Sequence, residues 1–226
     1  MAPLAFKDGR MDTGGKQDAR SELWPLLDLR LTTPRLELRL PREEELLRLG
    51  ALAPADLEAD PSWPSLPGNQ PIGTGVVRGL WRAVGEWKVD NWNLPLAVWS
   101  EGELVGVQGL EGERFAVRRG VESASWLAQE ARGLGIGKEM RAAVLSLAFD
   151  HLGAERATSG AWEWNESSLG VSRSLGYVDN GWDIHEHGEK AGVMRRVLLE
   201  KSHWDGAKWP TEVDGLAPCL AWFGAA

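Results

Sequence analysis

The residues best placed to do chemistry are a run of alternating glycines flanked by two cations. The run is Arg132-Gly133-Leu134-Gly135-Ile136-Gly137-Lys138, and it lies between a strand-like and a helical pattern. Glycine allows the backbone to turn sharply and to approach a ligand closely. The first N–H groups of a helix have no partners within the helix, and the helix dipole is positive there. The run therefore predicts an anion site suited to phosphate or diphosphate, to which Arg132 and Lys138 add positive charge.

Two common nucleotide motifs fit this run poorly. A Walker loop needs Ser or Thr after its lysine, and Glu139 follows Lys138. A dinucleotide-binding turn needs a third glycine where Lys138 stands, although Glu155 lies where its acidic residue is expected. A tight turn that binds nothing is the structural alternative.

Hydrophobic periodicity and turn residues predict the elements that position this run. Leu alternates with charged residues in the opening strand, and the Leu–Val pattern after the glycines is helical. In chain order we expect a strand at 33–40, a helix after Pro41, a proline-rich loop at 54–73, a helix at 75–91, a hairpin of strands at 94–99 and 103–109, a strand at 122–130, a helix at 137–152 and a strand at 155–162.

Three motifs together resemble the GNAT superfamily of acyl-CoA-dependent N-acyltransferases. The family signature Gln/Arg-x-x-Gly-x-Gly/Ala is matched by residues 132–137. Thr33-Pro34-Arg35-Leu36-Glu37-Leu38-Arg39 is similar to the opening strand of the Rim group, which acetylates ribosomal-protein N-termini, and Asn165-Glu166-Ser167-Ser168 with the closing Gly176-Tyr177 is similar to another segment of that group. The resemblance covers about residues 23–204 and is greatest to actinobacterial Rim-like proteins.

The resemblance implies an α/β (α+β) fold of the GNAT type. Its mixed, mostly antiparallel sheet is flanked by helices and splayed between the fourth strand, which holds Trp126, and the fifth strand. The pantetheine arm of CoA would lie in that split, against the backbone of Trp126 and Leu127. The diphosphate would bind the backbone N–H groups from Arg132 to Lys138, namely Arg132, Gly133, Leu134, Gly135, Ile136, Gly137 and Lys138. Asn165 would bond the CoA arm or acyl group, and Ser168 would approach the sulfur as a proton donor.

Other roles for these residues stay open. Asn165 is also a favoured helix N-cap, and Ser168 is also an ordinary solvated helical serine. No single general base can be selected, but Glu122 and Glu163 flank the split. His185 and His187 alternate with acids, which is a weak metal signal, so we expect no metal. Cys219 is expected to be a small buried apolar residue rather than a nucleophile.

Composition limits the function classes. The 226 residues carry 25 Lys and Arg against 33 Asp and Glu, a net charge of −8, which argues against nonspecific nucleic-acid binding. A single cysteine excludes an intrachain disulfide, and no apolar run has the roughly 20 residues of a membrane helix. We therefore expect a cytoplasmic protein. The 13 tryptophans are interpreted mainly as packing residues.

The predicted organisation is a flexible tail at 1–22, an acyltransferase domain at 23–204 and an extension at 205–226 that packs on the domain or on a partner subunit. Trp204, Trp209 and Trp222 near that end favour a homodimer or larger assembly. The predicted activity is transfer of an acyl group from acetyl-CoA, or from succinyl-CoA or another acyl-CoA, to a protein N-terminus, a lysine or a small amine. The alternatives are a CoA-binding module without catalysis and a dinucleotide-binding oxidoreductase.

Overall fold

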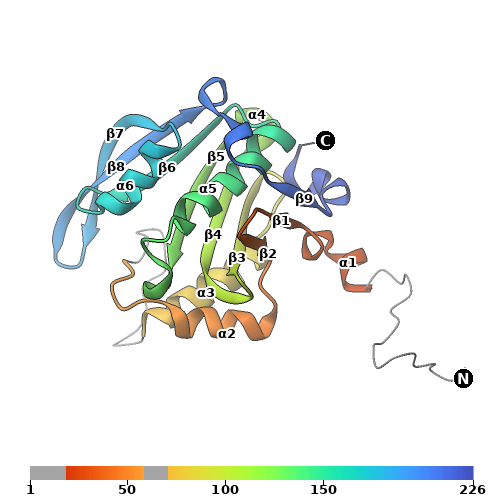
Figure 1. Cartoon of the computed structure of the whole chain (residues 1–226), viewed down its shortest axis with the longest axis horizontal. Coiled ribbons are helices and arrows are strands. Elements are labelled where there is room, and N and C mark those ends of the chain that lie inside the picture. The colour runs from red at the N-terminus through yellow and green to blue at the C-terminus, as the bar shows by residue number, and fades with distance from the viewer. Residues whose placement is uncertain (1–18, 59–70, 226) are drawn as a thin grey trace, which may run out of the picture.

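One mixed sheet forms the centre of the protein in a computed structural model that describes residues 19–58 and 71–225 (Figure 1). Its strand order is β7-β8-β6-β5-β4-β3-β2-β1-β9. Every neighbouring pair is antiparallel except β5 and β6. The predicted α/β class and mostly antiparallel sheet are therefore confirmed. The strands are β1 Arg30–Thr32, β2 Leu36–Arg39, β3 Asn91–Ser100, β4 Glu103–Glu113, β5 Gly120–Leu127, β6 Arg156–Trp162, β7 Val178–His187, β8 Lys190–Glu200 and β9 Glu212–Asp214.

The sheet opens between β5 and β6. These parallel strands pair only over Gly120–Glu122 and Arg156–Thr158. β5 continues to Leu127 while it stays paired with β4 on its other edge, and β6 continues to Trp162 while it stays paired with β8. The ladder between β5 and β6 therefore ends at Glu122, and the Ser123 carbonyl accepts from the Ser159 hydroxyl, at 2.8 Å. From Ala124 onward the edge of β5 that faces β6 is unpaired, as the predicted splay requires. We call the space between the two diverging strands the wedge.

The wedge lies between the predicted fourth and fifth strands, although they are the fifth and sixth in the structure. The predicted opening strand at 33–40 is instead two strands, β1 and β2, joined by a turn. Thr33 closes this turn, because its N–H donates to the Leu36 carbonyl at 2.9 Å. Pro34 within the turn has no N–H to donate to a sheet, which explains why the strand breaks there.

Helices cover both faces of the sheet. α2 (Glu43–Leu52) and α3 (Ile72–Gly85) pack with Ala97, Val107 and Trp126 on one face. α5 (Ile136–Ser146) and α6 (Glu166–Ser174) lie on the other face with Leu110 and Leu127. Two short helices, α1 (Ala19–Leu23) and α4 (Phe115–Arg118), complete the α-helices of the described residues. No helix among these residues is long and apolar enough to cross a membrane.

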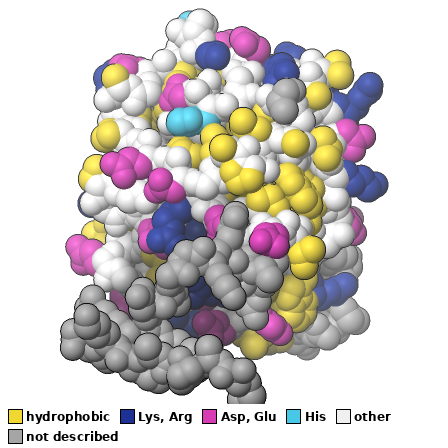
Figure 2. All heavy atoms as spheres, turned by 90° about the vertical axis from the view of Figure 1, so that its right-hand side faces the viewer, with side chains coloured by type: hydrophobic (Ala, Val, Ile, Leu, Met, Phe, Trp, Pro, Cys, Tyr) yellow, Lys and Arg dark blue, Asp and Glu magenta, His cyan; other side chains and the backbone are white. Residues whose placement is uncertain are grey.

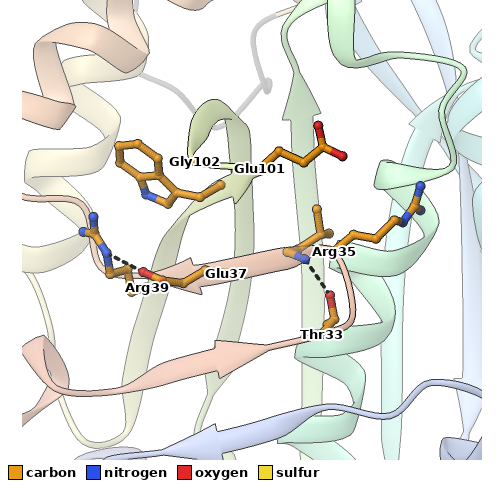
Figure 3. A pocket seen from close by; sticks show the side chains of 8 residues that line it. Thr33, Arg35, Glu37, Arg39, Glu101 and Gly102 are labelled. Atoms are coloured by element: carbon orange, nitrogen blue, oxygen red, sulfur yellow. Dashed lines mark hydrogen bonds and ion pairs between the residues drawn. The ribbon is translucent and has the colours of Figure 1, made fainter.

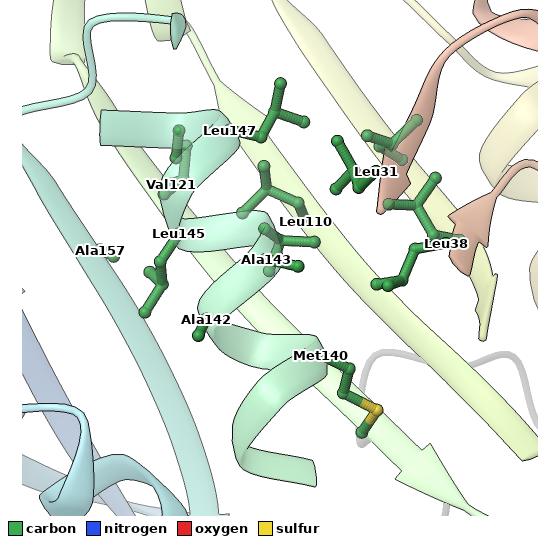
Figure 4. Packing of buried hydrophobic residues seen from close by; sticks show 14 of the residues in the cluster. Leu31, Leu38, Leu110, Val121, Met140, Ala142, Ala143, Leu145, Leu147 and Ala157 are labelled. Atoms are coloured by element: carbon green, nitrogen blue, oxygen red, sulfur yellow. The ribbon is translucent and has the colours of Figure 1, made fainter. Parts of the chain in front are cut away.

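α5 is the central helix of the larger core (Figure 4). Met140, Ala143 and Leu147 are buried with Leu31 and Leu110. The helix continues as a π-turn over Leu147–His151, and Gly153 follows at φ +75°. The predicted helix at 137–152 and its stop at Gly153 are therefore confirmed, with the start one residue earlier. Burying each large aliphatic side chain contributes about 1.5–3 kcal/mol, so this packing fixes the start of α5 against the sheet.

The C-terminal segment packs on the chain's own core. Cys219 and Phe223 are fully buried in the 3-10 helix Ala217–Phe223. The indole N–H groups of Trp87 and Trp92 donate to the carbonyls of Trp222 and Phe223. β9 also pairs with β1 at the sheet edge. Trp204 and Trp209 pack on the same core, so the aromatic residues that suggested a partner subunit have partners within the chain.

The N-terminal part differs from its prediction near residue 20. Residues 1–18 of the predicted tail lie outside the described residues, but α1 begins at Ala19 and Ser21 donates to Asp28 at 2.7 Å. Part of the predicted proline-rich loop, residues 59–70, is also outside them. Figure 2 views the side on which the C-terminus lies in Figure 1, and it shows hydrophobic side chains gathered beside basic and acidic ones.

Candidate active site

The glycine run forms an exposed turn at the start of α5. Gly133 and Gly135 adopt φ +76° and φ +80°, a left-handed conformation that costs other residues roughly 1–2 kcal/mol. Residues 132–135 are exposed. Within the described part of the chain, the backbone N–H groups of Gly133, Leu134, Gly135, Ile136 and Gly137 donate to no backbone carbonyl. These N–H groups lie at the positive end of an 11-residue helix, which is the arrangement that binds diphosphate.

The first and last of the backbone N–H groups predicted to bind diphosphate already donate to carbonyls of the protein. The Arg132 N–H donates to the Gln129 carbonyl at 3.2 Å, and the Lys138 N–H donates to the Gly135 carbonyl at 3.2 Å. The donors available to a ligand therefore run from Gly133 to Gly137, a shorter set than the predicted 132–138.

The charges beside the turn also differ from the prediction. Arg132 binds both carboxylate oxygens of Asp56, at 2.7 and 2.9 Å, and this hydrogen-bonded pair holds the pKa of Asp56 below its ordinary value. Arg132 thus ties the turn to the segment after α2, and its charge is already paired. Lys138 remains as a cation at this end of α5. Sequence reasoning missed Arg35, whose Nη1 donates to the Leu134 carbonyl at 3.0 Å.

A buried carboxylate anchors the turn from below. Glu139 accepts from the Thr33 hydroxyl at 2.6 Å, from the Arg35 N–H at 3.1 Å and from Arg35 Nε at 2.7 Å. Its side chain is 10% exposed, while that of Arg35 is 49% exposed. The opening strand motif contains Thr33 and Arg35, but its sequence does not show that Glu139 is their partner. The glycine turn therefore depends on the turn between β1 and β2 for its position.

We expect Glu139→Ala to lower the free energy of unfolding by about 2 kcal/mol, because it removes several hydrogen bonds to a buried charge. Arg35 can be hydrated, which keeps the loss below that of a fully buried pair. Urea denaturation followed by tryptophan fluorescence measures the change. Glu44→Ala, at an exposed position of α2, is the control. Equal stability of the two variants would contradict a stabilising role for the hydrogen bonds of Glu139.

Glu122 and Glu163 lie on opposite faces of the sheet. Alternate residues of a strand share a face, so Glu122 faces the same side as Trp126, toward α2 and α3. Glu122 contacts Arg196 at 3.3 Å, whereas Glu163 contacts Arg195 at 3.4 Å. Trp126 and Leu127 themselves face opposite sides, but both contribute backbone to the wedge. The structure therefore brings only one of the two predicted base candidates to the α2–α3 face.

Arg196 connects charges across the closed end of the wedge. Its Nε donates to Asp183 at 2.6 Å, and its Nη2 lies 3.4 Å from His185 Nε2. The guanidinium crosses β6 at Gly160, where an added Cβ would lie 2.8 Å from Arg196 Nη1. This network joins β5, β8 and β7 over β6. Arg196 also holds the pKa of Asp183 below its ordinary value through that hydrogen bond.

Asn165 and Ser168 begin α6. The Asn165 side-chain oxygen accepts from the Ser168 N–H at 3.1 Å. Asn165 therefore caps α6, the role expected from its residue type as an alternative to bonding the CoA arm. Its side-chain NH₂ makes no hydrogen bond within the described residues. The Ser168 carbonyl accepts from Ser172 Oγ at 3.2 Å, and its own hydroxyl is half-buried without a partner in that part of the chain.

The two histidines of β7 have separate partners. His187 Nε2 lies 3.2 Å from Glu58, and its ring contacts the stacked rings of Trp162 and Trp164. His185 instead lies beside Arg196. Among the described residues, no group of three or more His, Cys, Asp or Glu is arranged to hold a metal ion.

A hollow of about 400 Å³ lies beside β2 and the turn between β3 and β4 (Figure 3). Arg35, Glu37, Trp99 and Glu101 are among its lining residues. Arg35 and Glu37 already form ion pairs there. Because the hollow is not between β5 and β6, it does not contribute to the predicted pantetheine site.

Cys219 lies far from this site in the buried C-terminal segment. Burial raises the pKa of its thiol to about 11, so the reactive thiolate is scarce near neutral pH. We expect alkylation by iodoacetamide at pH 7 to be slow in the native protein and fast after unfolding, as mass spectrometry can measure. Rapid labelling of the native protein would contradict the burial of the Cys219 thiol.

The sheet opens between β5 and β6 beside an exposed glycine turn at the start of α5. Residues 35–178 match the acetyltransferase (GNAT) domain family. The chain therefore belongs to the GNAT family and is an N-acyltransferase. This assignment excludes the dinucleotide-binding oxidoreductase.

Solved structures with low sequence identity share the fold. The chain is similar to Mycobacterium smegmatis RimJ in complex with CoA-disulfide, with 18% identity, a TM-score of 0.67, and coverage of 86% of this chain and 96% of that chain. It is also similar to RimL, a ribosomal L7/L12 α-N-protein acetyltransferase in complex with coenzyme A, with 16% identity, a TM-score of 0.57 and coverage of 74% and 95%. A chimera of spermidine N-acetyltransferase SpeG from Vibrio cholerae and hSSAT shows 17% identity, a TM-score of 0.58 and coverage of 74% of this chain and 96% of that chain.

Proposed function

We propose that this protein binds acyl-CoA in the wedge and transfers the acyl group directly to a primary amine. The observation that carries the proposal is the set of free N–H groups from Gly133 to Gly137 beside the unpaired edge of β5. A diphosphate on that turn directs the rest of CoA toward the wedge. Acetyl-CoA is the first candidate donor, with succinyl-CoA or another acyl-CoA as alternatives, and the acceptor is a protein N-terminus, a lysine or a small amine.

The unpaired edge of β5 supports the position of the pantetheine arm. Backbone groups from Ala124 to Leu127 have no β6 partner, so the amides of pantetheine can pair with Trp126 and Leu127 as an added strand does. The Leu127 carbonyl also accepts from Arg132 Nε at 3.3 Å. The free side-chain NH₂ of Asn165 and the unpartnered hydroxyl of Ser168 lie at the start of α6. They are suited to bonding the arm and to protonating the departing sulfur.

Glu122 is our candidate for the base. An amine must lose a proton when it attacks the thioester carbonyl, and Glu122 lies on the face opposite α5 and α6, at the closed end of the wedge. Arg196 contacts only Oε1 of Glu122, which leaves Oε2 free to accept a proton. Orientation of amine and thioester in the wedge supplies a further part of the rate.

Mass spectrometry of the purified protein under native conditions identifies any retained acyl-CoA. It therefore tests CoA binding and the identity of the acyl group in one measurement. Release of CoA thiol is then followed with a panel of acyl-CoAs and amines. Turnover with at least one pair supports the proposal. Absence of binding at millimolar CoA in calorimetry contradicts it, and binding without turnover toward any amine points to the non-catalytic alternative.

The assembly state is a separate proposal. We propose a homodimer or larger assembly, as the sequence predicted, although the aromatic residues at the C-terminus pack within the chain. Light scattering at micromolar concentration measures the molar mass of the protein in solution. A mass equal to that of one chain would contradict the proposed assembly.

A further inference from the structure

The Arg141 side chain is a buried cation without an anionic partner. Arg141 lies on α5 and is 3% exposed. Its Nη1 donates to Ser172 Oγ at 2.7 Å and its Nη2 to Ser125 Oγ at 3.4 Å, while its Nε has no partner. No carboxylate of the described residues forms an ion pair with it, whereas Arg35, Arg39 and Arg132 all have one. Burying an unpaired charge is costly. A negatively charged group next to this guanidinium would offset that cost, and the described residues do not supply one.

The guanidinium lies beside the wedge. Ser125 belongs to the part of β5 beyond its last residue paired with β6, and Ser172 lies on α6, one turn after Ser168. Arg141 therefore spans the gap from β5 to α6, on the face of the sheet that α5 and α6 cover. A ligand that pairs with β5 at Ser125 would therefore lie near this positive charge.

The titratable group beside Arg141 supplies no negative charge near neutral pH. Tyr177 is buried, and burial raises the pKa of its hydroxyl, although the nearby Arg141 charge opposes that rise. The hydrogen-bond partners of Arg141 are the neutral serines Ser125 on β5 and Ser172 on α6. Glu122, the acid of the same stretch of β5, faces the opposite side of the sheet and contacts Arg196.

We propose that Arg141 supplies the positive charge that stabilises the sulfur of CoA as it leaves the acyl group. This inference rests on the proposed function. In the reaction, the amine nitrogen bonds to the thioester carbonyl carbon, the carbon–sulfur bond breaks, and its electron pair stays on sulfur as a thiolate. The amine proton passes to the base, and the thiolate afterwards takes a proton from the Ser168 hydroxyl, which regains one from solvent. The pantetheine arm is neutral, so negative charge arises in the wedge only during the reaction, first on the carbonyl oxygen and then on the sulfur, where we place the action of Arg141. Arg141 thus acts on the sulfur electrostatically, through space.

The wild-type protein gives the first test without any variant. The ultraviolet absorbance of thiolate, followed over pH with CoA bound, reports the pKa of the bound thiol. An opposite charge within about 4–6 Å lowers a pKa by about 1–3 pH units, so we expect a fall of that size relative to free CoA. Binding of CoA with an unshifted thiol pKa overturns the proposal but leaves the proposed function standing. Failure of CoA to bind removes both.

Two substitutions separate the charge from packing. Arg141→Met keeps a long side chain but removes the charge, and we expect the bound thiol pKa to return to its free value and kcat to fall about tenfold for each unit of that change. Arg141→Lys keeps the charge and is expected to retain most of the shift. Arg173→Met is the control, since it removes an exposed charge from α6 that pairs with Glu166.

A second possible source of negative charge is a carboxylate on the acyl group, as in succinyl-CoA. A comparison of acyl donors distinguishes it from the sulfur. The wild-type and Arg141→Met proteins are assayed with acetyl-CoA and with succinyl-CoA. Loss of kcat with both donors supports a role at the sulfur, which they share. Loss confined to succinyl-CoA overturns the proposal and assigns Arg141 to the carboxylate of the acyl chain. If Arg141→Met does not fold, the wild-type thiol titration and Arg141→Lys still decide.

Discussion

Gly135→Trp is expected to weaken CoA binding by about a hundredfold or more while the protein stays folded. Gly135 has φ +80° and lies in the exposed turn before α5, so an indole there shifts the turn and covers its free N–H groups. Each hydrogen bond to a charged group contributes about 1.5–3 kcal/mol, and about 1.4 kcal/mol is a tenfold change in affinity. Loss of two such bonds accounts for the effect, which isothermal titration calorimetry measures.

A matched control is available on β7. Gly181 also has a positive φ, of +90°, with no atom near its Cβ position. Gly181→Trp therefore carries the same conformational cost at an exposed position outside the turn. Unchanged CoA affinity of Gly135→Trp, or equal losses in the two variants, would show that the turn does not bind the diphosphate.

Glu122→Gln is expected to lower kcat by about a hundredfold, within the usual contribution of a general base. The amide keeps the shape of Glu122 and can still accept from Arg196, so the network across the wedge is preserved while proton acceptance is lost. KM for acyl-CoA is expected to stay nearly constant, because Glu122 faces away from α5 and its turn. Steady-state release of CoA thiol gives both constants.

Glu163→Gln tests the competing candidate. Glu163 pairs with Arg195 and lies on the other face of the sheet, so its amide variant is expected to keep nearly normal kcat. A large loss for Glu163→Gln with little loss for Glu122→Gln would reverse our choice of base. Similar small losses in both would mean that neither carboxylate takes the proton.

The turn and its helix were predictable because their signals are local. Glycines at positive φ, the helix start and the stop at Gly153 depend on neighbouring residues. The helix predicted at 75–91 was less accurate, because it ends at Gly85 and the next strand begins at Asn91. Trp87 fits the helical period, but its ring stacks on Trp92 of β3 at 6.0 Å. Packing with the following strand therefore overrides the periodicity.

The partners of the charged residues could not be predicted from local patterns. Arg132 pairs with Asp56, and Glu139 pairs with Arg35, across long stretches of sequence. These pairs form only when the sheet brings β2, the α2–α3 segment and α5 together. The same reason explains why Arg132 was expected to offer charge to phosphate and why Arg35 was overlooked. Arg141 lies within an ordinary helical pattern, so only the structure shows that its charge is buried.

A crystal structure of the protein with acyl-CoA tests the central claim most directly. We predict that diphosphate oxygens accept hydrogen bonds from the N–H groups between Gly133 and Gly137, and that the pantetheine arm lies between β5 and β6. The thioester would then lie between Glu122 on one face and Arg141 on the other. CoA bound elsewhere, with the turn closed by its own side chains and the strands unfilled, would contradict the account.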